Sequence, residues 1–179
     1  MIKIVVGNMF DYPAEYLFIG SNVRGHCEKP TSNVMQVLDL FTETDREEYE
    51  IDNQTLQTYG TGHFYVCKKG SSFGTVFIGY PGTGHQESFE EMLTFGLISV
   101  KLMRMMAPGM VSITMPLIGT NVGGLTLDEW VESFNKVLKE YDEGNTAFKF
   151  IKEITIVCKT EEQAKFLSEK IVLTYPPAI

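Results

Sequence analysis

The chain has 179 residues, of which 44% are hydrophobic and 21% charged, a composition typical of a soluble globular domain and not of a disordered segment. The 23 acidic residues outnumber 15 basic ones, and the formal net charge of -8 argues against general binding to nucleic acid or to an anionic membrane. At the usual ~100–200 residues per domain, we expect one domain that covers residues 1–179.

The cysteines and the N-terminus indicate the cellular environment. Cys27, Cys67 and Cys158 lie far apart, a spacing that favours neither a zinc site nor a disulfide framework. The N-terminal apolar run is too short for a signal peptide, and no stretch approaches the ~18 uncharged residues of a membrane span. We therefore expect a cytoplasmic protein that binds no metal and contacts no membrane.

Short β-rich runs alternate with longer helical patterns along the chain. This alternation predicts an α/β fold with a central mixed, mostly parallel sheet flanked by helices in three layers. The polar, acidic segment 42–60 is interpreted as a solvated connection, and the runs 63–67 and 75–79 as neighbouring strands of a hairpin. The remaining strands are predicted at 2–6, 16–19, 110–115 and 154–158, and helices from near Thr31 to Phe41, from Phe89 to before Pro108, from Leu127 to Leu138 and from Ala164 to Ile171.

Four methionines surround the end of the predicted long helix, namely Met103, Met105, Met106 and Met110. Methionine fills irregular gaps in hydrophobic cores. We expect these side chains to pack against the sheet and not to form a ligand site. Cys67 and Cys158 are likewise expected to be buried strand residues.

The junction between the strand ending at Met115 and the helix beginning near Thr126 is the first candidate ligand site. Its glycines, Gly119, Gly123 and Gly124, permit positive φ angles that turn backbone N–H groups toward an anion, and the following helix N-terminus adds a favourable dipole. A phosphate or diphosphate fits such a loop, although a plain turn is the alternative. The motifs of ATP hydrolysis and of a Rossmann cofactor are absent, and we expect no cofactor.

The second candidate junction is the segment 20–26, where an apolar strand leads into short polar side chains. The amide of Asn22 has the donors and the acceptor to bind a sugar hydroxyl, with an Asx turn as the alternative. His26, His63 and His85 have no carboxylate at an informative spacing, and Cys27 beside His26 has no orienting third group. The sequence therefore leaves the catalytic residue unknown, with His26 as a weak candidate.

Six short segments, in chain order, resemble motifs of the macro domain family. The first three together look like the opening of the family, where one strand ends in Gly-Asp-Ile and the next ends in an Asn-Ala-Ala-Asn-like motif. The other three are similar to its central Thr-Gly-Glu segment, its Ser-Ile-Ala-Phe-Pro-x-Ile-x-Thr-Gly diphosphate loop and its last core strand. The segments are 4–10 (IVVGNMF), 12–14 (YPA), 19–22 (IGSN), 61–63 (TGH), 112–124 (SITMPLIGTNVGG) and 152–158 (KEITIVC).

The resemblance implies binding of ADP-ribose or a related NAD-derived nucleotide, free or on an ADP-ribosylated protein. It places the adenine near Gly7, Asn8 and Met9 and the distal ribose near Ser21 and Asn22. The diphosphate would lie on Gly119, Thr120, Asn121, Val122, Gly123 and Gly124.

The sequence departs from the family pattern at positions that affect base recognition and catalysis. The adenine-reading Asp of the family is Asn8 here, and the segment 24–30 replaces an expected Gly-rich stretch. The sequence Met-Pro-x-Ile-Gly at 115–119 is similar to the branch that removes ADP-ribose from acidic side chains with a Lys and an Asp. That branch's Asp would fall within 121–124 and its Lys near 80–82, and neither residue type is present there.

We therefore expect a protein whose primary activity is recognition of an ADP-ribose-like ligand. Two alternatives stay open. One is a hydrolase that removes ADP-ribose from protein or acyl groups from ADP-ribose, and the other is a protein-interaction module that kept the fold without the ligand. General acid–base catalysis needs a titrating group near the reacting atom, and the sequence of the Gly-rich loop contains none.

Overall fold

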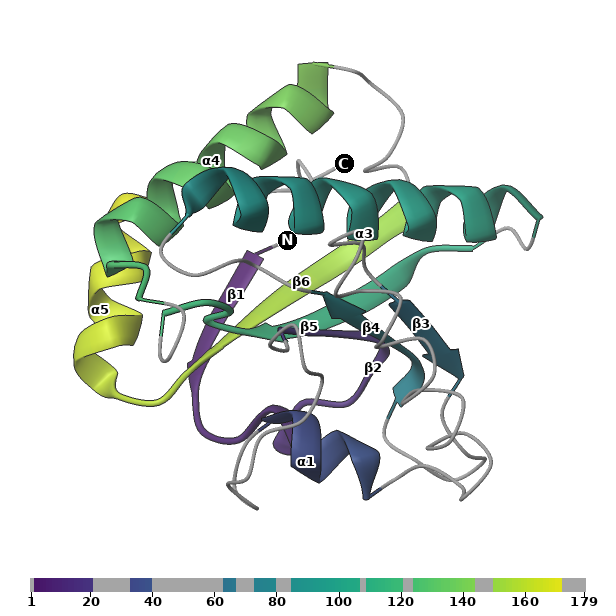
Figure 1. The fold of residues 1–179 in the computed structure, drawn as a ribbon, viewed down its shortest axis with the longest axis horizontal. Helices are drawn as coiled ribbons and strands as arrows, with labels where there is room; N and C mark the ends of the chain where they lie inside the picture. The colour runs from purple at the N-terminus through teal and green to yellow at the C-terminus, as the bar shows by residue number, and fades with distance from the viewer. Residues whose placement is uncertain are drawn as a thin grey trace.

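The computed structural model describes residues 2–20, 33–39, 63–66, 73–79, 85–106, 109–120, 124–143 and 150–171. These residues contain a six-stranded sheet with the strand order β1-β6-β5-β2-β4-β3 (Figure 1). The strands are β1 (Ile2–Val6), β2 (Ala14–Gly20), β3 (His63–Val66), β4 (Phe73–Gly79), β5 (Val111–Pro116) and β6 (Ile151–Cys158). The helices are the short 3₁₀ helix η1 (Met9–Asp11), α1 (Asn33–Leu38), α3 (Gln86–Met106), α4 (Leu127–Glu143) and α5 (Glu161–Lys170).

The sheet is mixed and mostly parallel, as the alternation of elements predicts. β1, β6, β5, β2 and β4 run parallel, and β3 pairs antiparallel with β4 at one edge. The predicted neighbours around 63–67 and 75–79 are thus confirmed as paired strands. Because the carboxyl ends of the parallel strands meet at one edge, the segments that follow them are brought to that edge.

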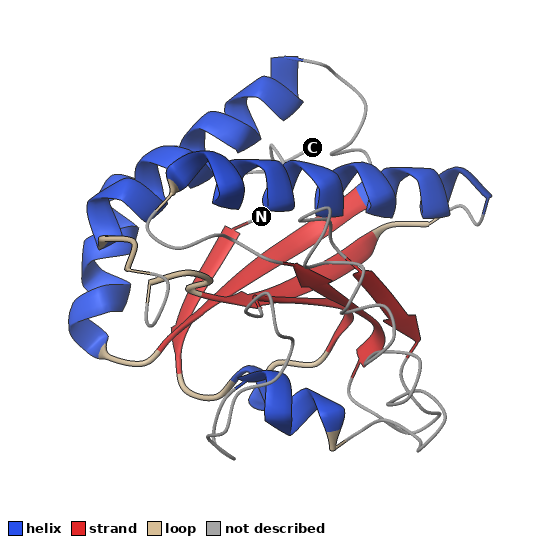
Figure 2. Cartoon of the chain, viewed as in Figure 1, coloured by secondary structure: helices blue, strands red, loops and turns tan. Residues whose placement is uncertain are grey.

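Both faces of the sheet are buried, which explains the continuous apolar runs of its central strands. In β2, Tyr16 and Phe18 belong to one core cluster and Leu17 and Ile19 to the other, as the two-residue period of a strand requires. Figure 2 shows α3, α4 and α5 over one face, with α1 beyond the other. The prediction of three layers is therefore confirmed.

The layer of α3 and α4 is joined by stacked aromatic rings. The ring of Trp130 lies 5.4 Å from that of Phe89 on α3 and 4.9 Å from that of Phe134 on its own helix, measured between centroids. All three side chains are fully buried in the same cluster. This packing, worth several kcal/mol in area alone, fixes α4 against α3.

The predicted elements agree with the observed ones in type, while several boundaries differ. β2 begins at Ala14, two residues before the predicted Tyr16, and β6 begins at Ile151 instead of Ile154. α1 begins at Asn33, whereas its predicted start near Thr31 and the segment 42–60 lie outside the described residues. Among the described helices, none has the length and apolarity needed to cross a membrane.

The prediction that the methionines pack against the sheet holds only for Met103, whose sulfur accepts from the hydroxyl of Tyr16 in β2 at 3.7 Å. Met103, Met105, Met106 and Met110 are 39%, 64%, 90% and 49% exposed. The buried stripe of α3 ends at Val100, and no later residue of this helix is buried. In its last turns only one side still meets the sheet, where Met103 and Arg104 contact Tyr16 of β2. The apolar residues in the last turns of α3 therefore extend the helix, although most of their side chains are exposed.

Candidate functional site

The candidate site lies at the carboxyl edge of the sheet, where the connections after β1 and β5 flank the end of β6. Val6 pairs with Cys158, and Pro116 pairs with Val157. The segment that begins at Gly7 and the loop that begins at Leu117 therefore leave the sheet on either side of one strand. The structure thus brings two of the three predicted binding segments to the same edge.

The segment after β1 is held to the sheet by its backbone. The Gly7 amide donates to the Cys158 carbonyl oxygen at 3.0 Å, and Gly7 adopts a φ of 150°, which favours glycine. The hydroxyl of Tyr12 donates to the Val6 carbonyl oxygen at 3.1 Å. A Cβ on Gly7 would meet the ring of Tyr12 at 3.4 Å, an ordinary contact, so the backbone angle and not the space favours glycine here.

Asn8 caps η1, and this explains what the residue does locally. Its side-chain oxygen accepts from the Phe10 amide at 3.1 Å, and the residue is exposed. An aspartate would supply the same capping acceptor, so the local turn tolerates either residue. Met9 is only 3% exposed and packs in the cluster with Leu17 and Ile19, where it anchors η1 to the sheet.

The loop after β5 is closed by a hydrogen bond at its base. The Leu125 amide donates to the Gly119 carbonyl oxygen at 3.0 Å, and the flanking residues Ile118 and Leu125 are buried. Gly119 and Gly124 adopt φ angles of 82° and 76°, which confirms the expected left-handed backbone at these two glycines. The Thr120 hydroxyl donates to the Leu117 carbonyl oxygen at 2.8 Å, which stabilises the turn entering the loop.

The N-terminus of α4 is capped by its own side chains. The Thr126 amide donates to Glu129 Oε1 at 3.1 Å, and the Glu129 amide donates to Thr126 Oγ1 at 3.2 Å. This reciprocal pair is a capping box, and the pattern T-x-x-E at 126–129 would have indicated it from the sequence. With Asp128 also in the first turn, the positive end of the helix dipole already faces two carboxylates. An anion at this edge must therefore be held mainly by loop amides.

Several predicted site residues lie outside the described residues. They are Ser21, Asn22, His26, Asn121, Val122 and Gly123. The segment 80–82, where a family lysine was sought, is also outside. The predicted residues that the structure does describe are Gly7, Asn8 and Met9 on one side of β6, and Gly119, Thr120 and Gly124 on the other.

Among the described residues at this edge, the thiol belongs to Cys158. Cys158 ends β6 and is fully buried, as its sequence predicts, and desolvation raises the pKa of its thiol to about 11. The thiol is therefore protonated at neutral pH and serves as a packing residue. Within the described parts of the chain, His, Cys, Asp and Glu side chains form no group able to hold a metal ion.

Comparison with known proteins identifies the fold. No family model and no curated protein matches the sequence. Among solved structures, a mutant of the Oceanobacillus iheyensis macrodomain with ADPR has a TM-score of 0.72 at 16% identity, covering 94% of this chain and 90% of that one. The Mycobacterium tuberculosis DarG macrodomain has a TM-score of 0.63 at 15% identity, covering 90% and 99%.

A third similar structure is the Trypanosoma brucei macrodomain in complex with ADP, with a TM-score of 0.64 at 13% identity over 95% of this chain and 68% of that one. All three are macrodomains, and the similarity covers 90% or more of this chain in each comparison. The chain therefore has the macrodomain fold.

Proposed function

We propose that this protein binds ADP-ribose, or a related NAD-derived nucleotide, at the carboxyl edge of its sheet. The diphosphate lies against the loop from Gly119 to Gly124, the adenine beside Gly7 and Asn8, and the distal ribose beside Asn22. The observation that carries the proposal is the closed loop between Gly119 and Leu125, with left-handed glycines at both ends, beside the Gly7 segment. Similar folds crystallised with ADPR and with ADP support the choice of ligand.

The mode of recognition follows from the charges near the loop. The protein has a net charge of -8, and α4 begins with Asp128 and Glu129, so long-range electrostatics oppose an anionic ligand. Binding then depends on short-range hydrogen bonds from backbone amides, which left-handed glycines turn in a common direction. At the other end, Asn8 uses its oxygen to cap η1, so its amide NH₂ is the group available to a base, and it favours a base acceptor over a base donor.

We infer recognition without fast turnover, by a cytoplasmic protein that takes free or protein-linked ADP-ribose. Hydrolysis requires a group of suitable pKa at the reacting atom, which supplies roughly 10²–10⁴-fold of rate. The sequence of the loop at 119–124 holds no titrating side chain, and the buried Cys158 thiol is protonated at neutral pH.

The experiment is a calorimetric and thermal-shift comparison of two glycine variants. Gly124→Asp adds a carboxylate to the proposed diphosphate loop and is expected to abolish ADP-ribose binding; its φ of 76° strains any residue with a Cβ, Asp less than most. Gly109→Asp is the matched control for that strain. Gly109 also has a positive φ, of 149°, but it precedes β5 at the opposite end of the strand, and a Cβ there meets nothing within 4 Å.

We expect the parent and Gly109→Asp to bind ADP-ribose equally, and Gly124→Asp to stay folded without binding. Equal affinity in all three proteins would place the ligand elsewhere. Rapid release of ADP-ribose from a modified glutamate or serine substrate by the parent protein would overturn the preference for binding over hydrolysis, and loss of that activity in His26→Ala would identify the catalytic group.

A further inference from the structure

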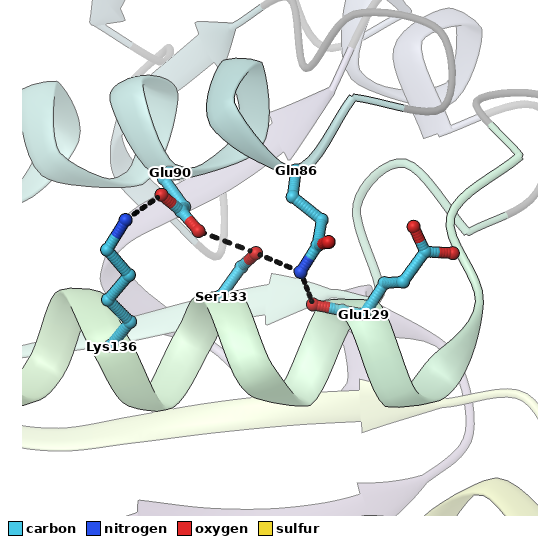
Figure 3. A network of polar contacts seen from close by, with 5 residues as sticks. All are labelled: Gln86, Glu90, Glu129, Ser133 and Lys136. Atoms are coloured by element: carbon cyan, nitrogen blue, oxygen red, sulfur yellow. Dashed lines mark hydrogen bonds and ion pairs between the residues drawn. The ribbon is translucent and has the colours of Figure 1, made fainter.

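A polar network joins α3 to α4 next to the aromatic stack. Ser133 of α4 donates from its hydroxyl to Glu90 Oε1 at 3.0 Å and accepts from Gln86 Nε2 at 3.2 Å. Lys136 donates to Glu90 Oε2 at 2.8 Å, and Gln86 Nε2 also donates to the Glu129 carbonyl oxygen at 3.2 Å. Figure 3 shows that Gln86 and Glu90 reach across from one helix to the facing side of the other.

The polar network lies in apolar surroundings, where a hydrophobic side chain would need no hydrogen-bond partners. Ser133 is fully buried, and its neighbours along α4, Trp130, Phe134 and Val137, belong to the hydrophobic core. Burying a hydroxyl is costly unless it is hydrogen-bonded, and here it is both donor and acceptor. Satisfied buried networks specify one arrangement of the elements that carry them, because any shift leaves a polar atom without its partner.

The helices that the network joins both begin at the edge that holds the candidate site. α3 begins at Gln86, after β4, and α4 begins directly after the loop that leaves β5. Gln86 Nε2 donates to the main-chain carbonyl of Glu129, whose side chain accepts from the Thr126 amide. The residue before Thr126 is Leu125, whose amide closes the loop on Gly119. A continuous series of hydrogen bonds and peptide bonds thus connects α3 to the base of the loop.

We propose that Gln86, Glu90 and Ser133 are positioning residues for the base of the loop, formed by Gly119, Leu125 and Thr126. They fix the position of the α4 N-terminus against α3, and so the position of Leu125, which closes the loop on Gly119. Lys136 has a lesser part, because it binds the outer oxygen of Glu90 and is itself largely exposed. The ion pair with Glu90 raises the pKa of Lys136, so the lysine stays charged at neutral pH. Only the identity of the ligand rests on the proposed function; the positioning of the loop base by α3 does not.

The test is amide hydrogen exchange on the unliganded protein, which does not depend on any ligand. In Gln86→Ala and in Ser133→Ala we expect exchange at the Thr120, Leu125 and Thr126 amides to accelerate about tenfold, in line with the loss of a typical hydrogen bond. Exchange in β6 should stay unchanged. Lys136→Met, which removes only the exposed ion pair, is the matched control and should leave the loop amides as in the parent.

Two further measurements separate positioning from general destabilisation. Glu90→Gln keeps an acceptor for the Ser133 hydroxyl and should retain the loop protection of the parent, whereas Glu90→Ala should lose it. ADP-ribose affinity should fall about tenfold in Gln86→Ala while adenosine affinity stays unchanged, because only the diphosphate contacts the loop. If the parent binds no ADP-ribose, the proposed function fails and the exchange result still decides the positioning role. Parent-like loop exchange in both Gln86→Ala and Ser133→Ala, or equal acceleration in β6, would overturn the proposal.

Discussion

The carboxylate of Glu129 gives a charge test of where the diphosphate lies. Glu129→Gln keeps an acceptor for the Thr126 amide, now 3.1 Å from the carboxylate oxygen, and removes the negative charge at the α4 N-terminus. The free protein should lose about 0.3–1 kcal/mol of stability, the usual size of a charge–dipole interaction at a helix end. Glu129→Ala also loses the capping acceptor, and we expect about 0.5–2 kcal/mol.

The ligand should respond in the opposite direction. Two unit charges ~10 Å apart in water repel by ~0.4 kcal/mol, so a diphosphate with two charges gains ~0.8 kcal/mol when the Glu129 charge is removed. This corresponds to roughly fourfold tighter binding at low ionic strength. At ~1 M salt the Debye length is ~3 Å and the gain should disappear.

The assay is calorimetric titration of ADP-ribose at low and high salt, with Glu140→Gln as the matched control. Glu140 is exposed on the same helix, about three turns further from the loop, so its charge should have little effect on the ligand. Affinity that is equal in Glu129→Gln, Glu140→Gln and the parent at low salt would refute a diphosphate beside the α4 N-terminus.

Three further predictions concern the fold. Burial raises the thiol pKa of Cys158 to about 11 and the phenol pKa of Tyr141 to about 12. Because both groups lose their protons at lower pH in the unfolded state than in the folded state, the free energy of unfolding should fall above about pH 9. Each group that titrates lowers it by roughly 1.4 kcal/mol per pH unit. Denaturant titrations between pH 8 and 11 measure this, and a flat profile would contradict the burial of Cys158. Native Cys158 should also resist alkylation that modifies it fully in denaturant, as mass spectrometry of its peptide would report. Gly96→Ala should lower the free energy of unfolding by about 1–3 kcal/mol, because its Cβ would stand 2.9 Å from the ring of Phe18. The control, Met106→Ala, should change the free energy of unfolding by less than about 0.5 kcal/mol, since Met106 is exposed. Equal melting temperatures for the two variants would exclude the close packing of α3 on β2.

The strands could be predicted because their signal is local. β2 and β6 are apolar over several successive residues, and a run buried on both faces cannot be mistaken for a surface segment. The exposure of Met105 and Met106 could not be predicted, because it depends on how many neighbouring elements cover the last turns of α3. That coverage is a property of the assembled layers and not of the helix sequence.

The candidate site was only partly open to prediction. The glycines at 119 and 124 are recognisable because few other residues adopt positive φ, and both do so. Gln86 and Ser133 are 47 residues apart and form part of no motif, so their hydrogen bond exists only after α3 and α4 have packed. The capping role of Asn8 depends on a 3₁₀ turn that the sequence alone did not indicate.

ADP-ribose binding is tested most directly by a calorimetric titration of the parent protein, supported by a melting curve at saturating ligand. We expect 1:1 binding, and at 100 times the Kd a stabilisation of ~2.7 kcal/mol, which raises the Tm by roughly 5–11 °C for a chain of this size. Absence of both heat and thermal shift at millimolar ADP-ribose, in a protein shown to be folded, would contradict it.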